Sequence, residues 1–101
     1  MAEFVKVGKT SDFPSGAGKI VEVNGKTLAV FNVEGNFYAL DNTCLHRGGP
    51  IADGELDGTN VVCPWHGWRY DLRTGGTTFN PAVGLNTYQV RVEGDEISVE
   101  A

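Results

Sequence analysis

The chain has 101 residues, of which 41% are hydrophobic and 21% are charged, and its formal net charge is −5. Its eight basic residues are scattered along the sequence, which argues against a nucleic-acid partner because phosphate contacts require clustered lysines and arginines. No segment approaches the ~20 apolar residues of a membrane span, and the N-terminus lacks the pattern of a signal peptide. We therefore expect one monomeric, cytoplasmic domain over residues 1–101 that does not insert into a membrane.

Short β-strands are predicted in the first part of the chain, where apolar and β-branched residues lie between turn signals. Asn24-Gly25 is the strongest short-range hairpin signal in the sequence. A turn or brief helical corner is expected at residues 10–14, and a second turn at residues 34–36. The predicted strands are residues 4–7, 19–23, 26–33 and 37–40.

The second part of the chain continues with short strands and many turns. Residues 53–58 are polar and predict a turn, and residues 79–85 predict an irregular loop. The strict alternation of residues 96–100 predicts a half-buried strand that pairs with the strand before it. The remaining predicted strands are residues 60–62, 69–72 and 87–92. Since no segment has a sustained helical period, the fold class is all-β, a sandwich or barrel of short antiparallel strands.

Two short segments contain every cysteine and histidine of the chain, as Cys44-x-His46 and Cys63-x-x-His66. In a reducing compartment two cysteines are better explained as metal ligands than as a disulfide, and a disulfide leaves both histidines unexplained. The pattern therefore predicts a metal site with four protein ligands.

The pairing of ligand types distinguishes two metal centres. Structural zinc sites with two cysteines and two histidines usually pair like with like, whereas here each segment holds one of each. A [2Fe–2S] cluster with two thiolates on one iron and two imidazoles on the other needs one ligand of each kind from each loop. The spacing favours the cluster, and a zinc-stabilised binding module is the remaining alternative.

The two segments resemble those of Rieske-type [2Fe–2S] proteins. The first runs over residues 44–50 and ends at Pro50, the second runs over residues 63–68 with Gly67 after its histidine, and 16 residues lie between the two. Residues 80–82, Asn-Pro-Ala, resemble the proline-containing loop that covers the cluster in that family.

The resemblance implies a fold of three small antiparallel sheets, with one cluster at the tip between two loops. The cluster-binding part corresponds to about residues 42–70, and the covering loop to about residues 79–85.

The resemblance also assigns roles to the ligands and their neighbours. Cys44 and Cys63 are expected to bind the inner iron, and His46 and His66 the outer one. The residues expected around the cluster are Trp65, Trp68, Tyr70 and Pro81. Each tryptophan is open to three interpretations, namely shielding of the cluster, docking of a partner, or packing against the loop; the Tyr70 hydroxyl either bonds a cysteine sulfur or belongs to an ordinary strand residue.

Differences from the high-potential members of the family predict a low midpoint potential. Gly49 and Trp65 stand where those proteins have a pair of disulfide-bonded cysteines, and Trp68 stands where they have a serine that donates a hydrogen bond to the cluster. Histidine ligands raise the potential above that of plant-type ferredoxins. We therefore expect a value at the low end of the family's range of roughly −150 to +300 mV.

The function implied by the resemblance is that of a ferredoxin, which passes electrons from an NAD(P)H-dependent flavin reductase to a terminal oxygenase. The chain is not expected to be the catalyst, since no histidine is left for a mononuclear iron and no dinucleotide-binding motif is present. The alternative is the small Rieske subunit of an NAD(P)H-dependent nitrite reductase.

Overall fold

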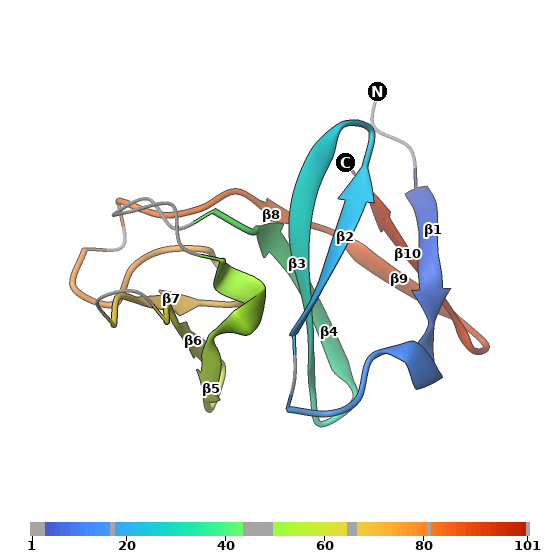
Figure 1. Cartoon of the computed structure of the whole chain (residues 1–101), viewed down its shortest axis with the longest axis horizontal. Helices are drawn as coiled ribbons and strands as arrows, with labels where there is room; N and C mark the ends of the chain where they lie inside the picture. Colours follow the sequence, from blue (N-terminus) through green and yellow to red (C-terminus); the bar gives the residue numbers. More distant parts are fainter. Residues whose placement is uncertain (1–3, 17, 44–49, 65–66, 81, 101) are drawn as a thin grey trace.

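The computed structural model describes residues 4–16, 18–43, 50–64, 67–80 and 82–100. Over this part of the chain, ten β-strands and two short 3₁₀ turns are found (Figure 1). The elements are β1 (Phe4–Lys9), η1 (Thr10–Asp12), β2 (Gly18–Val23), β3 (Lys26–Val33), β4 (Asn36–Asp41), η2 (Ile51–Asp53), β5 (Glu55–Asp57), β6 (Asn60–Val62), β7 (Arg69–Asp71), β8 (Thr87–Tyr88), β9 (Val90–Glu93) and β10 (Glu96–Glu100).

The strands form three antiparallel sheets with the orders β1-β10-β9, β2-β3-β4-β8 and β5-β6-β7. The four-stranded sheet lies in the middle, and the small sheet β5-β6-β7 stands to one side of it (Figure 1). This is the all-β arrangement of three small sheets that the resemblance implied. Neither 3₁₀ turn, at three residues each, could cross a membrane, and the described part of the chain has no longer helix.

Strand β3 is buried on both of its faces. Leu28 and Val30 point into an apolar cluster shared with the sheet β1-β10-β9, whereas Ala29 and Phe31 point into a second cluster shared with η2 and the small sheet. Side chains alternate across a strand, so one strand contributes to both clusters. The central sheet therefore joins the side of the molecule that contains Cys63 to the side formed by β1, β9 and β10.

The tight turns follow from residues that tolerate a positive φ. Asn24 and Gly25 have φ angles of 51° and 81° and connect β2 to β3, as the hairpin signal predicted. Glu34 has a φ of 52° in the next turn, where a non-glycine residue is strained. Two side-chain acceptors hold that turn, because Ser15 Oγ accepts the Glu34 N–H at 3.2 Å and Asn32 Oδ1 accepts the Gly35 N–H at 2.8 Å.

Two predictions about local structure were wrong. The segment 53–58, predicted as a turn, contains strand β5. Only Leu56 of this strand is apolar and turned inward, so the alternating pattern is too short to predict a strand among acidic residues and glycines. The strand predicted over residues 87–92 is two strands in different sheets. It breaks at Gln89, whose carbonyl accepts the Glu100 N–H at 2.9 Å as the chain passes to the outer sheet.

We predict that Gly54→Ala destabilises the protein more than Gly58→Ala. A Cβ at Gly54 would overlap the Val62 carbonyl oxygen and lie 2.9 Å from Val61 Cγ2. A Cβ at Gly58 would have no atom within 4 Å other than those of its chain neighbours, so alanine there is opposed only by the φ of 62°. We expect a loss of about 1 kcal/mol for Gly58→Ala and about 2–3 kcal/mol for Gly54→Ala.

The apparent Tm measures the difference, since 1 kcal/mol corresponds to about 4–8 °C in a domain of this size. Equal Tm values for the two variants would contradict the assigned steric cause.

Candidate metal centre

The chain around the first predicted ligand segment is clamped by Asn42, which is buried. Its carbonyl accepts the Ile51 N–H at 2.7 Å, and its side-chain Oδ1 accepts the Ala52 N–H at 2.9 Å. Thr43 and Pro50 form an antiparallel bridge beside these bonds. Thr43 and Pro50, which flank residues 44–49 in the sequence, are therefore held side by side.

The described residues of the second predicted ligand segment belong to the connection between β6 and β7. The Cys63 N–H donates to the Trp68 carbonyl at 2.7 Å, and the Gly67 N–H donates to the Cys63 carbonyl at 3.2 Å. Gly67 has a φ of 76°, which glycine adopts without strain. Cys63 is thereby placed at the end of β6, where a two-strand frame fixes its backbone.

Cys63 of the second segment lies in an apolar cluster and lines a hollow. Ile51 of η2, Cys63 and Tyr70 are all buried in the cluster that also contains Phe31 of β3. A hollow of about 420 Å³ lies over this cysteine, and two exposed carboxylates contribute to its wall. The described residues that line it are Asp53, Glu55, Val62, Cys63, Pro64 and Gly67.

A third loop, residues 77–83, is attached to the small sheet through a bridge between Tyr70 and Thr77. Hydrogen bonds within the loop fix its shape. The Thr77 N–H donates to the Val83 carbonyl at 2.8 Å, and the Thr77 hydroxyl donates to the Asn80 carbonyl at 2.6 Å. The Asn80 Oδ1 accepts the Ala82 N–H at 3.1 Å. The described residues of predicted loop 79–85 are irregular, as expected, but they are held by many backbone contacts.

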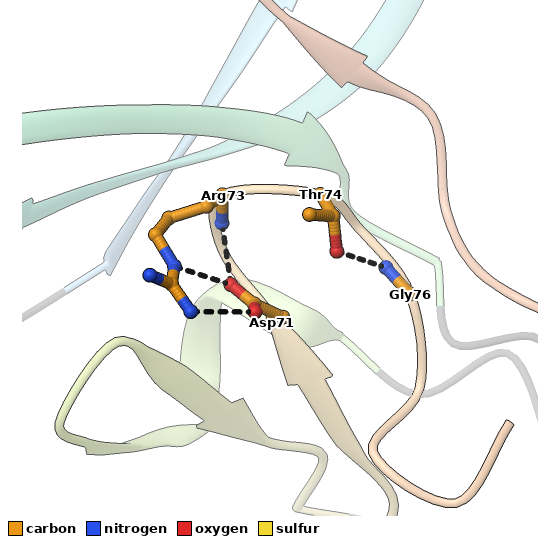
Figure 2. A network of polar contacts seen from close by, with 4 residues as sticks. All are labelled: Asp71, Arg73, Thr74 and Gly76. Atoms are coloured by element: carbon orange, nitrogen blue, oxygen red, sulfur yellow. Dashed lines mark hydrogen bonds and ion pairs between the residues drawn. The ribbon is translucent and has the colours of Figure 1, made fainter. Parts of the chain in front are cut away.

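The turn that leads into this loop is closed by Asp71 and Arg73. Figure 2 shows the Arg73 guanidinium beside the Asp71 carboxylate, with bonds of 3.2 Å from Nε and 3.1 Å from an Nη. The Arg73 N–H donates to the same carboxylate at 2.9 Å, and Thr74 Oγ1 accepts the Gly76 N–H at 3.2 Å (Figure 2). These contacts set the direction in which the chain enters loop 77–83.

Hydrogen bonds from the Arg73 side chain lower the pKa of Asp71 below its usual value of 3.8, and they outweigh the opposite effect of partial burial. Because the pKa of Asp71 is lower in the folded state, its ion pair with Arg73 stabilises the fold fully at pH values above the usual pKa of 3.8. It is lost as the pH falls through the folded-state pKa. The turn thus keeps its ion pair at neutral pH.

The structure describes three of the residues that the sequence placed at or around the site. Cys63 is 1% exposed, Tyr70 is buried in the same cluster, and Trp68 is half-buried against it. The other predicted site residues lie outside the described residues: Cys44, His46, Trp65, His66 and Pro81.

Three residues that shape the site were not predicted from the sequence, namely Asn42, Asp71 and Arg73. Their signals were weak, since an asparagine after a strand and an Asp-x-Arg turn occur on many surfaces. Phe79 was also missed as a functional candidate. Its ring makes an edge contact with the Trp68 ring, with centroids 4.9 Å apart and an interplanar angle of 81°.

The described surroundings fit a metal–sulfur centre. Cys63 offers a thiol, a soft donor, at the end of β6, and the apolar cluster excludes water from its inner side. The adjoining hollow opens beside it, between the β6-β7 hairpin and η2.

Comparison with known proteins identifies the centre. Residues 3–89 match the model of the Rieske [2Fe–2S] domain. The chain belongs to the Rieske [2Fe–2S] domain family. A Rieske-type [2Fe–2S] cluster is therefore its cofactor, and the zinc alternative is set aside.

Among its relatives, this Rieske protein is 38% identical over 90 residues to the ferredoxin component of the naphthalene 1,2-dioxygenase system of Pseudomonas aeruginosa, covering 88% of this chain and 86% of that one. It also superimposes with a TM-score of 0.86 on the ferredoxin in a complex of reduced oxygenase and oxidized ferredoxin in carbazole 1,9a-dioxygenase. The identity is 34%, over 96% of this chain and 92% of that one.

A Mycobacterium tuberculosis structure assigned as an NADH-dependent nitrite reductase small subunit gives a TM-score of 0.93 at 21% identity. That match covers 100% of this Rieske chain and 96% of the other. At this identity the likeness shows the shared fold alone.

We predict that Asn42→Ala weakens the centre, because it leaves the Ala52 N–H without its acceptor beside the first ligand segment. A buried unsatisfied donor costs about 1–3 kcal/mol, so the temperature at which the visible cluster absorption is lost should fall by several degrees. Asn42→Asp retains an acceptor oxygen, so its temperature of absorption loss should fall less than that of Asn42→Ala. Asn86→Ala, at an exposed position, serves as the control, and its free energy of unfolding should stay within about 0.5 kcal/mol of the parent value. If the temperature of absorption loss is unchanged in Asn42→Ala, the Asn42 hydrogen bonds do not support the centre.

Proposed function

We propose that the chain is a one-electron carrier of a multicomponent oxygenase system. It would accept an electron from an NAD(P)H-dependent flavin reductase and deliver it to a terminal oxygenase. The observation that carries this proposal is Cys63, buried where β6 ends in a chain whose Rieske relatives include ferredoxin components of dioxygenase systems.

The proposed ligands of the [2Fe–2S] cluster are Cys44, His46, Cys63 and His66. When bound, the cluster supplies a site that takes up and releases one electron. Two features of the chain support this set. The Asn42 clamp holds the ends of the first ligand segment, and the hydrogen bond between Cys63 and Trp68 closes the second.

The protein's own residues perform three tasks around that centre. The apolar cluster containing Phe31 and Tyr70 excludes water on the inner side. The hairpin fixes Cys63, so that little rearrangement accompanies a change of charge. The carboxylates of Asp53 and Glu55, which line the hollow at Cys63, disfavour added negative charge and so support the expected low midpoint potential.

The chain would act as a component of an oxidoreductase system and not as its catalyst, in keeping with its relatives. The nitrite reductase alternative is weaker, because the matching structure is 21% identical whereas the oxygenase-bound ferredoxin is 34% identical. A single cluster domain over residues 1–101, a monomeric state and a cytoplasmic location remain predictions from the sequence.

We predict that Cys63→Ser loses the cluster. The native protein should be reddish-brown, with visible absorption that dithionite bleaches and two irons per chain. A serine hydroxyl is a harder and weaker ligand for this centre, so the variant should bind little iron and unfold at lower temperature, since ligand binding contributes to folding.

Ala52→Ser is the matched control, because it adds a hydroxyl to the same buried cluster without removing the thiol. It should keep its colour and its iron. A native visible spectrum in Cys63→Ser would show that this residue is not a ligand.

We predict that the purified chain restores turnover in an oxygenase assay that lacks its ferredoxin. The assay contains NADH, a flavin reductase and one of several terminal oxygenases. These are the oxygenase encoded nearest to this gene and those of the naphthalene 1,2-dioxygenase and carbazole 1,9a-dioxygenase systems. Hydroxylated product should form only when the chain is added, and Cys63→Ser should not support it.

Nitrite reductase is tested in parallel. If the chain supports nitrite-dependent NADH oxidation with a nitrite reductase large subunit, and supports none of the oxygenases, the second function replaces the first.

A further inference from the structure

Loop 77–83 carries an unusual concentration of exposed apolar surface. Phe79 is 61% exposed and Val83 is 38% exposed. The other large exposed apolar side chains of the described residues lie singly on strands of different sheets, Ile20 on β2 at 47% and Val92 on β9 at 45%. An aromatic ring left in water beside a second apolar side chain is typical of a surface that binds another protein.

The loop contains no charged residue, since residues 77–83 read Thr-Thr-Phe-Asn-Pro-Ala-Val. This is notable in a chain with 21% charged residues and a net charge of −5. A partner that approaches here removes Phe79 from water without having to desolvate a carboxylate or ammonium on the same loop. The loop is therefore suited to apolar contact.

The exposed ring is presented on a rigid frame. The four backbone and side-chain bonds among Thr77, Asn80 and Val83 fix the loop, and the Asp71–Arg73 turn fixes its entry. A residue that is already ordered loses little conformational entropy when a partner binds. Phe79 thus has the properties of an interface anchor.

Phe79 is connected through one residue to Cys63, a proposed ligand. Its ring contacts Trp68, whose carbonyl accepts the N–H of Cys63. Trp68 is two residues from the predicted ligand His66 in the sequence. A partner seated on Phe79 would approach this side of the centre, as electron transfer requires.

We propose that Phe79, supported by Val83, is the anchor on which the terminal oxygenase docks. This inference rests on the proposed function. The choice of the oxygenase over the reductase follows from the relative at 34% identity, whose solved structure is a complex of ferredoxin with oxygenase. In the step concerned, one electron leaves the reduced chain and reduces the oxygenase, with no bond formed or broken.

The test compares Phe79→Ser with Val92→Ser, which removes an exposed apolar side chain from a distant sheet. Each protein is reduced with dithionite, freed of excess reductant, and mixed anaerobically with the oxidised oxygenase that passed the turnover assay. The dependence of the observed rate on oxygenase concentration gives an apparent Kd. We expect Phe79→Ser to raise it about tenfold, Phe79→Leu about threefold or less, and Val92→Ser less than about twofold.

Two further measurements separate docking from other effects. Oxidation by ferricyanide and the midpoint potential should be the same in Phe79→Ser as in the parent, because neither requires the oxygenase. If ferricyanide oxidation changes as much as transfer to the oxygenase, Phe79 shields the centre and the docking proposal is wrong.

The remaining outcomes are also decisive. An unchanged apparent Kd in Phe79→Ser overturns the proposal, and so does a defect confined to electron uptake from the reductase, which would make this surface the reductase site. If the unsubstituted chain reduces none of the oxygenases, the proposed function itself fails. That result differs from the one that overturns only the docking proposal, in which the unsubstituted chain reduces the oxygenase and Phe79→Ser does so with the same apparent Kd.

Discussion

Burial of β3 on both faces is the constraint on which the rest of the structure depends. Leu28 and Val30 complete the cluster toward the outer sheet, and Ala29 and Phe31 complete the one that contains Cys63. A slip of one residue would send each pair into the wrong cluster. The Asn24-Gly25 turn fixes the register of β3 against β2. That register determines that Ala29 and Phe31 face the cluster that contains Cys63.

On this frame, the loops around the centre are held mainly by bonds at their bases. Asn42 closes the first, the bond from Cys63 to Trp68 closes the second, and Thr77 closes the third. Most of these bonds involve backbone groups. A rigid scaffold that presents loops in this way is the usual arrangement of functional sites.

The features predictable from the sequence were those with a local physical cause. Alternating side chains predicted β10, Asn24-Gly25 predicted the first hairpin, and the mixed Cys/His pairs predicted the cofactor. Strand β5 and the break at Gln89 depend on pairing with residues distant in the sequence. The role of Asn42 likewise depends on the position of the Ala52 N–H, which is ten residues away in the sequence, and no local pattern predicts that the two groups meet.

The distribution of charge and apolar surface suits a protein that must bind and then leave. An electron carrier has to dissociate after each transfer, and such complexes bury less than about 1,200 Å². Acidic side chains line the hollow at Cys63, whereas the uncharged loop 77–83 exposes Phe79 and Val83 on its own. In the proposed complex, one rigid aromatic anchor would give contact at a defined place, and the absence of a larger apolar surface around it among the described residues would favour rapid dissociation.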